Sequence, residues 1–135
     1  MIHPLLTRLH DELGYPSLDL DGHSRFLGSP GVVVLFFPGD PAKFKDTTDV
    51  AVVLPEIVGA FPGRLRPAVV VDVAADAALM ERYAFSHHPA LVFVQNGALL
   101  GSICGIRDWM DYVAEVKGML NRAEGRQPRI PMVQL

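Results

Sequence analysis

The amino-acid sequence predicts an α/β protein of three layers, in which helices flank a central mixed sheet of four to five strands. Residues 31–37 form a continuous apolar, β-rich run, which is typical of a central strand covered on both faces. Asn96 and Gly97 separate two further β-rich runs and are the strongest short signal for a two-residue hairpin turn. Between the β-rich runs that precede the hairpin lie segments whose apolar residues recur at helical spacing. Strands and helices therefore alternate along the chain before the hairpin adds an antiparallel edge.

The N-terminal segment is predicted to be helical from residue 3 to residue 13, because its leucines recur at helical spacing before Gly14. Residues 15–20 could form a short edge strand. Asp21 is then placed to cap a second, short helix that runs to about Gly28. A Ser-Pro-Gly break follows and separates this helix from the first buried strand.

Residues 38–48 are predicted to be a polar loop after the first buried strand. Thr48 or Asp49 is expected to cap the helix that follows, which runs to about Ala60. Pro55 lies inside this helix, where a proline removes one backbone hydrogen bond at a cost of about 3 kcal/mol. A kink at this position is therefore expected, together with packing that compensates for it.

Residues 66–73 are predicted to be a second buried strand, and residues 74–84 an alanine-rich helix. Two strands, residues 90–95 and 98–103, then form the hairpin. In the last helix, Trp109 is expected to belong to the core. The face predicted for that helix consists of Ile106, Trp109, Met110, Val113, Val116 and Leu120.

At 135 residues, of which 50% are hydrophobic, the chain is long enough to bury the core of one domain. We predict that residues 1–122 form this domain. Residues 123–135 are predicted to be a flexible tail, since this segment is too rich in proline and polar residues to pack independently. No apolar run approaches the about 20 residues that cross a bilayer, and the N-terminus lacks the apolar core of a secretory signal. A cytoplasmic protein without membrane insertion is therefore expected.

The charge is distributed unevenly along the chain. Residues 121–135 carry three arginines against one glutamate, so the net charge of −3 for the whole chain leaves −5 on the rest. An acidic body repels the phosphates of nucleic acids and favours a basic partner. The composition therefore argues against a nucleic-acid ligand.

Cys104 is the single cysteine, which excludes an intrachain disulfide, CxxC redox chemistry and a multi-cysteine metal site. It is better explained as a small buried hydrophobic residue than as a reactive thiol, because the sequence shows no base near it. His87 and His88 are neighbours on an extended chain and point to opposite sides, which argues against a shared metal ion. No cofactor is predicted. The remaining histidines are expected at the surface: His3, His10 and His23.

The order of these elements, together with two prolines, resembles the thioredoxin fold over residues 15–122. Thioredoxins carry a cis-proline directly before the first strand of the hairpin, and His88-Pro89 followed by an apolar strand is similar to that segment. Pro55 matches the proline of the family's second helix. Counting back from it places residues 47–50, Thr-Thr-Asp-Val, where thioredoxins have Cys-x-x-Cys. The resemblance therefore implies a thioredoxin-like fold without its redox centre.

Within that superfamily, the sequence resembles the hydrogenase expression/formation proteins of the HyaE and HupG type, which lack the cysteine pair. The segments that carry this resemblance are GVVVLFFPGDPAK, LPEIVGAFP, RYAFSHHPALVFVQNGALLGSICGI and the following Trp109. The resemblance implies a chaperone for the small-subunit precursor of nickel–iron hydrogenases, which recognises the twin-arginine signal peptide of that precursor. It also allows other hydrogenase maturation proteins as partners.

Four carboxylates in or just after the polar loop could pair with the two guanidinium groups of a twin-arginine motif, because carboxylates bind arginine in bidentate geometry. A solvated loop explains any one of them at least as well, and two nearby lysines weaken the acidic character of the segment. The four residues are Asp40, Asp46, Asp49 and Glu56.

Three further residues are candidates for partner binding. Thr47 lies at the predicted start of a helix, where the helix dipole favours an anion, although simple capping explains this segment as well. His88 and Pro89 could present their backbone to an extended peptide, or they could serve only to direct the chain into the hairpin.

The leading functional hypothesis is a non-enzymatic chaperone that shields the hydrogenase small-subunit precursor. An alternative is a single-cysteine reductase of the thioredoxin superfamily that works through Cys104. A third hypothesis is a structural module that self-associates, for example as a homodimer. The missing cysteine pair and the acidic body favour the first hypothesis.

Overall fold

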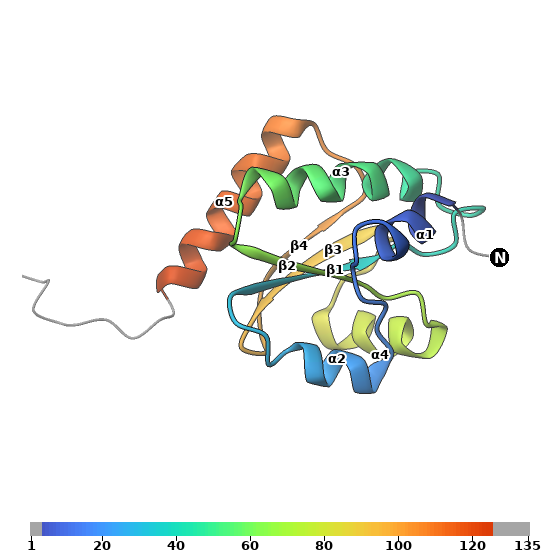
Figure 1. Ribbon diagram of the computed structural model, residues 1–135, viewed down its shortest axis with the longest axis horizontal. Helices are drawn as coiled ribbons and strands as arrows, with labels where there is room; N and C mark the ends of the chain where they lie inside the picture. The colour runs from blue at the N-terminus through green and yellow to red at the C-terminus, as the bar shows by residue number, and fades with distance from the viewer. Residues whose placement is uncertain (1–3, 126–135) are drawn as a thin grey trace, which may run out of the picture.

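The computed structural model describes residues 4–125 as a four-stranded mixed sheet between two layers of helices (Figure 1). The predicted three-layer α/β architecture is confirmed. Among these residues, no helix combines the length and apolar character needed to cross a lipid bilayer. The elements in chain order are α1 (Pro4–Asp11), α2 (Leu20–Phe26), β1 (Val32–Phe37), α3 (Thr47–Ala60), β2 (Leu65–Val69), α4 (Val73–Tyr83), β3 (Ala90–Gln95), β4 (Ala98–Cys104) and α5 (Trp109–Gly125).

The strands are ordered β2-β1-β3-β4, so the first strand of the chain lies inside the sheet. β1 pairs in parallel with β2 and antiparallel with β3, and β4 extends the antiparallel part. The edge strand expected at residues 15–20 is wrong, because only one bridge joins Ser17 to Val69. Pro16 has no N–H to donate, and Asp19 already turns the chain into α2, so this pairing does not extend.

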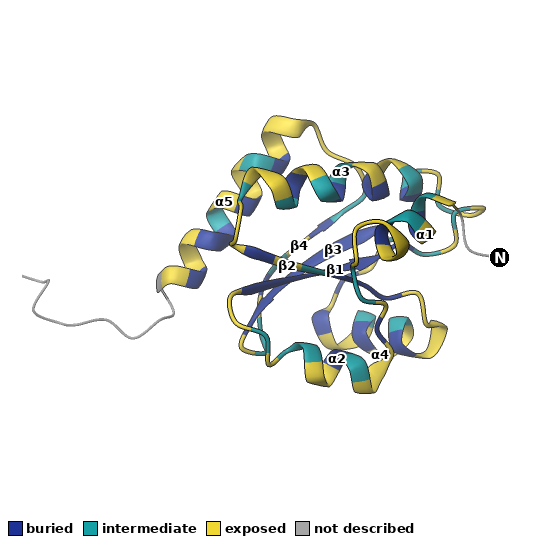
Figure 2. Ribbon diagram, viewed as in Figure 1, coloured by how far each residue is buried: buried dark blue, intermediate teal, exposed yellow. Residues whose placement is uncertain are grey.

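β1 is buried along its whole length and separates two hydrophobic cores (Figure 2). Its side chains alternate between the faces of the sheet. The even-numbered residues from Val32 to Phe36 pack with residues of α1, α3 and α5. The odd-numbered residues from Val33 to Phe37 pack with residues of α4 and against the partly buried end of α2. The prediction of a central strand covered on both faces is confirmed.

α3 begins at Thr47, so neither Thr48 nor Asp49 is the cap that the sequence predicts. The N-cap position is Asp46, whose carboxylate makes no capping hydrogen bond. Thr47 is fully buried, and its hydroxyl donates to the carbonyl of Pro38, directly after β1. A tertiary contact with the end of β1 therefore holds the start of α3, in place of a capping side chain.

α2 is capped by Asp19 and not by the predicted Asp21, because Oδ1 of Asp19 accepts the N–H of Gly22 at 2.7 Å. The prediction that His23 lies at the surface is also wrong. His23 is 1% exposed, and its Nε2 lies 2.7 Å from the hydroxyl of Tyr83 on α4. This hydrogen bond satisfies two polar groups between α2 and α4, where an unpaired group would destabilise the fold.

The other sequence predictions hold with small changes of boundary. Pro55 lies inside α3, as predicted. β2 ends at Val69, earlier than predicted, and Asp72 caps α4 by accepting a backbone N–H of the first turn at 2.9 Å. Asn96 and Gly97 have φ angles of 51° and 81°, the left-handed conformations that a type I′ hairpin turn requires.

α5 differs from the predicted helix in the residues that it buries. Trp109 is 43% exposed and Met110 is 72% exposed, so the expectation that Trp109 belongs to the core is wrong. The helix starts at Trp109, and its first turn stands clear of the sheet (Figure 1). It continues to Gly125, whereas the rest of the predicted tail, residues 126–135, lies outside the described residues. The buried residues of α5 are Tyr112, Val116, Met119, Leu120 and Ala123.

The buried His23 gives the protein a pH-dependent stability. Burial lowers the pKa of His23, and the positive charge of Arg82 lowers it further. Folded His23 therefore stays neutral at a pH where the unfolded chain already takes up a proton, which happens below about 6.5. The contribution of His23 to the free energy of unfolding is complete above that pH and is lost as the pH falls toward the lower, folded pKa.

Urea denaturation at about pH 7.5 and about pH 5.5 tests this expectation. The wild type should lose stability between the two values, and His23→Gln should lose clearly less, although it starts from a lower stability. His87→Gln is the matched control, because His87 is exposed. An equal loss in wild type and His23→Gln would contradict the assignment.

Candidate functional site

Gly105, which follows β4, lies close to the start of α3 and to Pro89, the residue before β3. The peptide bond between His88 and Pro89 is cis, as the resemblance implies, and Pro89 is buried. The carbonyl of Pro89 accepts the N–H of Gly105 at 2.8 Å. A carboxylate oxygen of Asp46 lies 4.0 Å from the position that a Cβ on Gly105 would occupy. Two predicted site residues that are far apart in sequence, Asp46 and Pro89, thus both lie near Gly105.

Thr47 belongs to the same region, but its hydroxyl is engaged inside the protein with the carbonyl of Pro38. No thiol lies at residues 47–50. Cys104 is at the end of β4 and is partly buried against the core beneath α2 and α4, close to its predicted role as a small hydrophobic residue. The start of α3 therefore offers backbone and carboxylate groups where a redox thioredoxin offers sulfur.

A cavity of about 640 Å³ opens beside His88, outside the ends of β1 and β2. Its walls come from α1, the loop after β1, the segment after β2 and α4. Three ionisable side chains lie among apolar ones: Asp40, Asp76 and His88. The apolar and small residues that line it are Leu6, Pro38, Gly39, Pro41, Val70, Val71, Val73, Ala77 and Met80. Ligands of α/β sheets commonly bind at the carboxyl ends of the strands, which is where this cavity lies.

His88 is held in this cavity by a carboxylate. Its Nε2 lies 2.9 Å from both carboxylate oxygens of Asp76, and the side chains are only 12% and 18% exposed. The rings of Phe44 and Phe85 pack against the imidazole, with centroids 5.2 Å and 5.7 Å away. Asp76 is a site residue that the sequence did not predict, because helical spacing shows that it lies in a first turn but not which loop faces it.

Gly39 makes this close packing possible. It has a φ of +71°, and a Cβ at this position would lie 2.7 Å from the Phe44 ring and 2.8 Å from Cβ of His88. Any other residue would both strain the backbone and push His88 away. The glycine therefore fixes the distance between the loop after β1 and the imidazole.

The second ring nitrogen of His88 is available to a ligand. Within residues 4–125, no protein group bonds to Nδ1, and every buried side-chain nitrogen or oxygen has a partner, so Nδ1 reaches solvent. When Nε2 donates its proton to Asp76, Nδ1 carries a lone pair and accepts hydrogen bonds. The cavity thus combines an acceptor, carboxylates and apolar walls.

Asp40 lies in the same cavity as His88, and part of its hydrogen-bonding capacity is used locally. Oδ1 of Asp40 accepts the N–H of Ala42 at 2.9 Å, and the residue is exposed. A carboxylate has about four acceptor positions, so Asp40 can still bind a cation while it holds this turn. Asp40 and His88 are the predicted site residues that the cavity unites.

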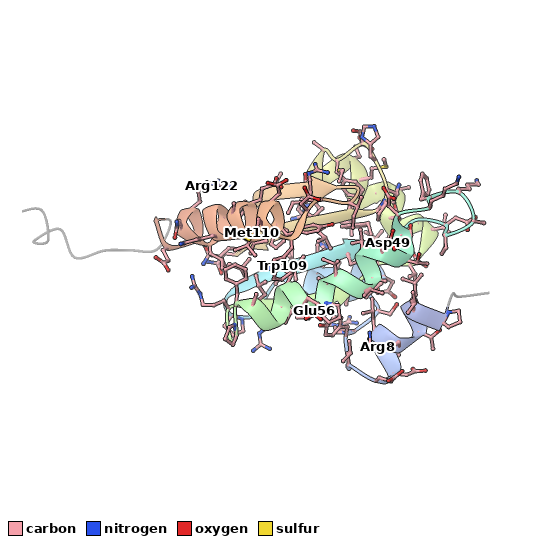
Figure 3. The ribbon with its side chains drawn as sticks, turned by 90° about the horizontal axis from the view of Figure 1, so that it is seen from above. Arg8, Asp49, Glu56, Trp109, Met110 and Arg122 are labelled. Carbon is pink, nitrogen blue, oxygen red and sulfur yellow. The ribbon has the colours of Figure 1, made fainter. Side chains whose placement is uncertain are left out.

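Asp49 and Glu56 lie elsewhere, on the outer surface of α3 (Figure 3). Both are exposed, and the exposed Val52 lies between them at helical spacing. Neither carboxylate lines the cavity. The four predicted carboxylates therefore do not form one patch, because Asp40 lines the cavity, Asp46 lies near Gly105, and Asp49 and Glu56 lie on α3.

The histidines do not form a metal site in the described part of the chain. His87 bonds to the hydroxyl of Ser86 and His88 to Asp76, so the two neighbours face different partners. Across residues 4–125, no three histidine, cysteine or acidic side chains are arranged to hold a metal ion. His10 is exposed, as predicted, and His3 lies outside the described residues.

Comparison of the fold with solved structures shows the same architecture in a thioredoxin-superfamily protein. A yeast mitochondrial 1-Cys peroxiredoxin aligns with a TM-score of 0.61 over 81% of this chain and 96% of its own, at 18% identity. This likeness concerns the fold alone, and it confirms the thioredoxin-like fold that the sequence resemblance implies.

Comparisons with closer relatives identify the family. Residues 5–112 match the family model described as hydrogenase-1 expression protein HyaE. The hydrogenase expression/formation protein HoxO of Azotobacter vinelandii is 44% identical over 98% of this chain and 88% of its own. HupG of Rhodobacter capsulatus is 41% identical over 87% of this chain and 86% of its own. The crystal structure of a HupG protein from Rhodopseudomonas palustris aligns with a TM-score of 0.57 and 39% identity, over 84% of this chain and 99% of that one. The chain therefore belongs to the HyaE family of hydrogenase expression/formation proteins.

Proposed function

We propose that this protein is a non-enzymatic chaperone of hydrogenase maturation that binds the twin-arginine signal peptide of the small-subunit precursor. Its relatives are named for hydrogenase expression and formation, which supports the pathway. The observation that carries the peptide-binding role is the cavity beside His88, which joins carboxylates to apolar walls. The precursor carries its signal peptide before export, so the proposed binding takes place in the cytoplasm.

The cavity suits a peptide in which arginines precede apolar residues. The carboxylates of Asp40 and Asp76 can accept hydrogen bonds from guanidinium groups, and such charge-assisted bonds are stronger than neutral ones. Val71 and Val73 are exposed apolar residues in the same cavity. They can cover an apolar side chain of the peptide, which stabilises the complex by about 25 cal/mol for each Å² of apolar surface removed from water.

His88 can form a hydrogen bond with the backbone of a bound peptide. Nδ1 reaches solvent and can accept an N–H of an extended chain, while Asp76 holds the ring through Nε2. An immobilised ring loses little conformational entropy on binding. The Asp76–His88 hydrogen bond thus supports recognition without any bond-breaking step.

The alternative of a single-cysteine reductase has only one possible nucleophile. Cys104 is partly buried at the end of β4 and makes no hydrogen bond through its sulfur within the described residues. Reactive thiols lie in exposed, electropositive positions such as helix N-termini. The position of Cys104 therefore favours binding over thiol chemistry.

Titration calorimetry with a synthetic twin-arginine signal peptide tests the proposed ligand. We expect binding, and we expect the peptide with both arginines replaced by lysine to bind about tenfold more weakly, because lysine cannot form the bidentate pair. Equal affinity for the two peptides would contradict the proposal. So would the absence of binding to a peptide that a known signal-peptide chaperone binds.

Removing one carboxylate tests the proposed site. Asp40→Asn should weaken the twin-arginine peptide about tenfold, which corresponds to about 1.4 kcal/mol and is at the low end for a hydrogen bond to a charged group. Asp21→Asn is the control, because Asp21 is an exposed carboxylate on α2 and lies outside the cavity. If both variants bind as wild type does, the cavity is not the peptide site.

Substitution of the cysteine separates binding from redox chemistry. Cys104→Ser should bind the signal peptide with unchanged affinity, and the wild type should show no disulfide reductase activity with glutathione as the reductant. Reductase activity in the wild type that disappears in Cys104→Ser would instead favour the single-cysteine enzyme.

A further inference from the structure

The exposed apolar side chains on the outer side of α3 and α5 form a surface that the signal-peptide cavity does not include. We call it the α3–α5 face and define it by Val52, Trp109 and Met110 together with Asp49 and Glu56. Trp109, Met110, Asp49 and Glu56 are labelled in Figure 3. Val52 is 48% exposed, Trp109 is 43% exposed and Met110 is 72% exposed. α3 and α5 lie next to each other over the same face of the sheet (Figures 1 and 3).

These side chains lie outside both hydrophobic cores. α3 reaches the core through Leu54 and Ile57, and α5 does so from Tyr112 onward. Trp109 and Met110 precede that contact and leave apolar surface in water. Tryptophan and methionine are enriched where proteins bind other proteins and depleted on surfaces that stay solvated.

Most of the charged side chains around the apolar residues are negatively charged carboxylates. Asp49 and Glu56 lie on α3, and the exposed Asp108 and Asp111 lie at the start of α5. Arg107, which precedes Asp108, donates to the carbonyl of Cys104 at 2.6 Å and lies 3.8 Å from the carboxylate of Glu115, so part of its charge is offset by that carboxylate.

Other cations lie on α1 and farther along α5. Arg8 is on α1, which packs beside α3, and Arg122 lies near the end of α5 with its guanidinium bonded to the carbonyl of Leu100 at 2.9 Å (Figure 3). Lys117 is exposed, two turns beyond the start of α5. The apolar centre is therefore bordered mainly by carboxylates.

We propose that the α3–α5 face docks an amphipathic helix of a partner protein, whose apolar side covers Trp109, Met110 and Val52. Arginines or lysines along one border lie against Asp49 and Glu56 on α3, and those along the other border lie against Asp108 and Asp111 at the start of α5. A helix presents an apolar stripe and two basic borders at once, which fits carboxylates contributed by two helices. A second copy of this chain fits poorly, because a two-fold contact would bring the carboxylates of both copies together. This surface is distinct from the cavity, so the proposal stands independently of signal-peptide binding.

Trp109 is the only tryptophan in the chain, so its fluorescence reports on this face directly. The probes are two synthetic amphipathic peptides of about 18 residues with the same leucine stripe, one with arginine and one with glutamate borders. We expect the leucine–arginine peptide to move Trp109 emission to shorter wavelengths and the leucine–glutamate peptide to leave it unchanged. Affinity should fall about tenfold for Met110→Ser and for the double variant Asp49→Asn/Glu56→Gln.

Matched controls change the same residue types elsewhere. Leu20→Ser alters an apolar residue that is 44% exposed on α2, and Asp11→Asn/Glu12→Gln removes two exposed carboxylates at the end of α1. Both should bind the leucine–arginine peptide as the wild type does. The twin-arginine signal peptide should bind the Met110→Ser variant unchanged, so failure at one surface can be told from failure at the other.

Several outcomes would overturn the proposal. Equal binding of the two probes, or equal losses in the face variants and the controls, would show non-specific attraction. A dimer in sedimentation that dissociates on Met110→Ser would assign the face to a second copy. If the emission of Trp109 without any peptide differs between the wild type and the variant Arg126→Gln/Arg129→Gln, the face would be assigned to the basic residues of the chain's own C-terminal segment.

Discussion

The complete burial of β1 between two helical layers is the constraint on which the rest of this structure depends. All six residues of the strand are buried, and each apolar side chain removed from water contributes about 1.5–3 kcal/mol. A strand buried on both faces also needs partners for its backbone on both edges. β2 and β3 supply them, one in parallel and one antiparallel. The mixed sheet and the two separate cores follow from this single requirement.

The candidate cavity is a consequence of the same arrangement. The parallel strands β1 and β2 end at the same edge of the sheet, and the chain segments that leave them form two walls of the cavity. The hydroxyl of Thr47 ties the start of α3 to the carbonyl of Pro38 at this edge. Gly39 then lets Phe44 and His88 approach each other, which leaves the imidazole facing Asp76. Rigid elements therefore hold the polar groups that a ligand would meet.

Two pairs of carboxylates lie on different surfaces of the molecule. Asp40 and Asp76 belong to a concave site with a fixed histidine, whereas Asp49 and Glu56 lie beside exposed Trp109 and Met110 on the outside of the helical layer. A thioredoxin-like fold that has no cysteine pair can thus keep the positions around its cis-proline and still add a separate surface on α3 and α5. Under the proposed function, recognition by shape and charge would take the place of thiol chemistry on both surfaces.

Three features could be predicted from the amino-acid sequence: the alternation of strands and helices from residue 31 onward, the central position of residues 31–37 and the hairpin turn at Asn96 and Gly97. These features depend on local periodicity and turn chemistry, which neighbouring residues decide. Three others are visible only in the folded protein, namely that His23 is buried against Tyr83, that Asp76 faces His88 and that Trp109 is exposed. Each of these depends on contacts between elements distant in sequence or on where a helix first meets the sheet. Helical spacing shows which residues share a face, but only the packing of the layers decides whether that face is covered.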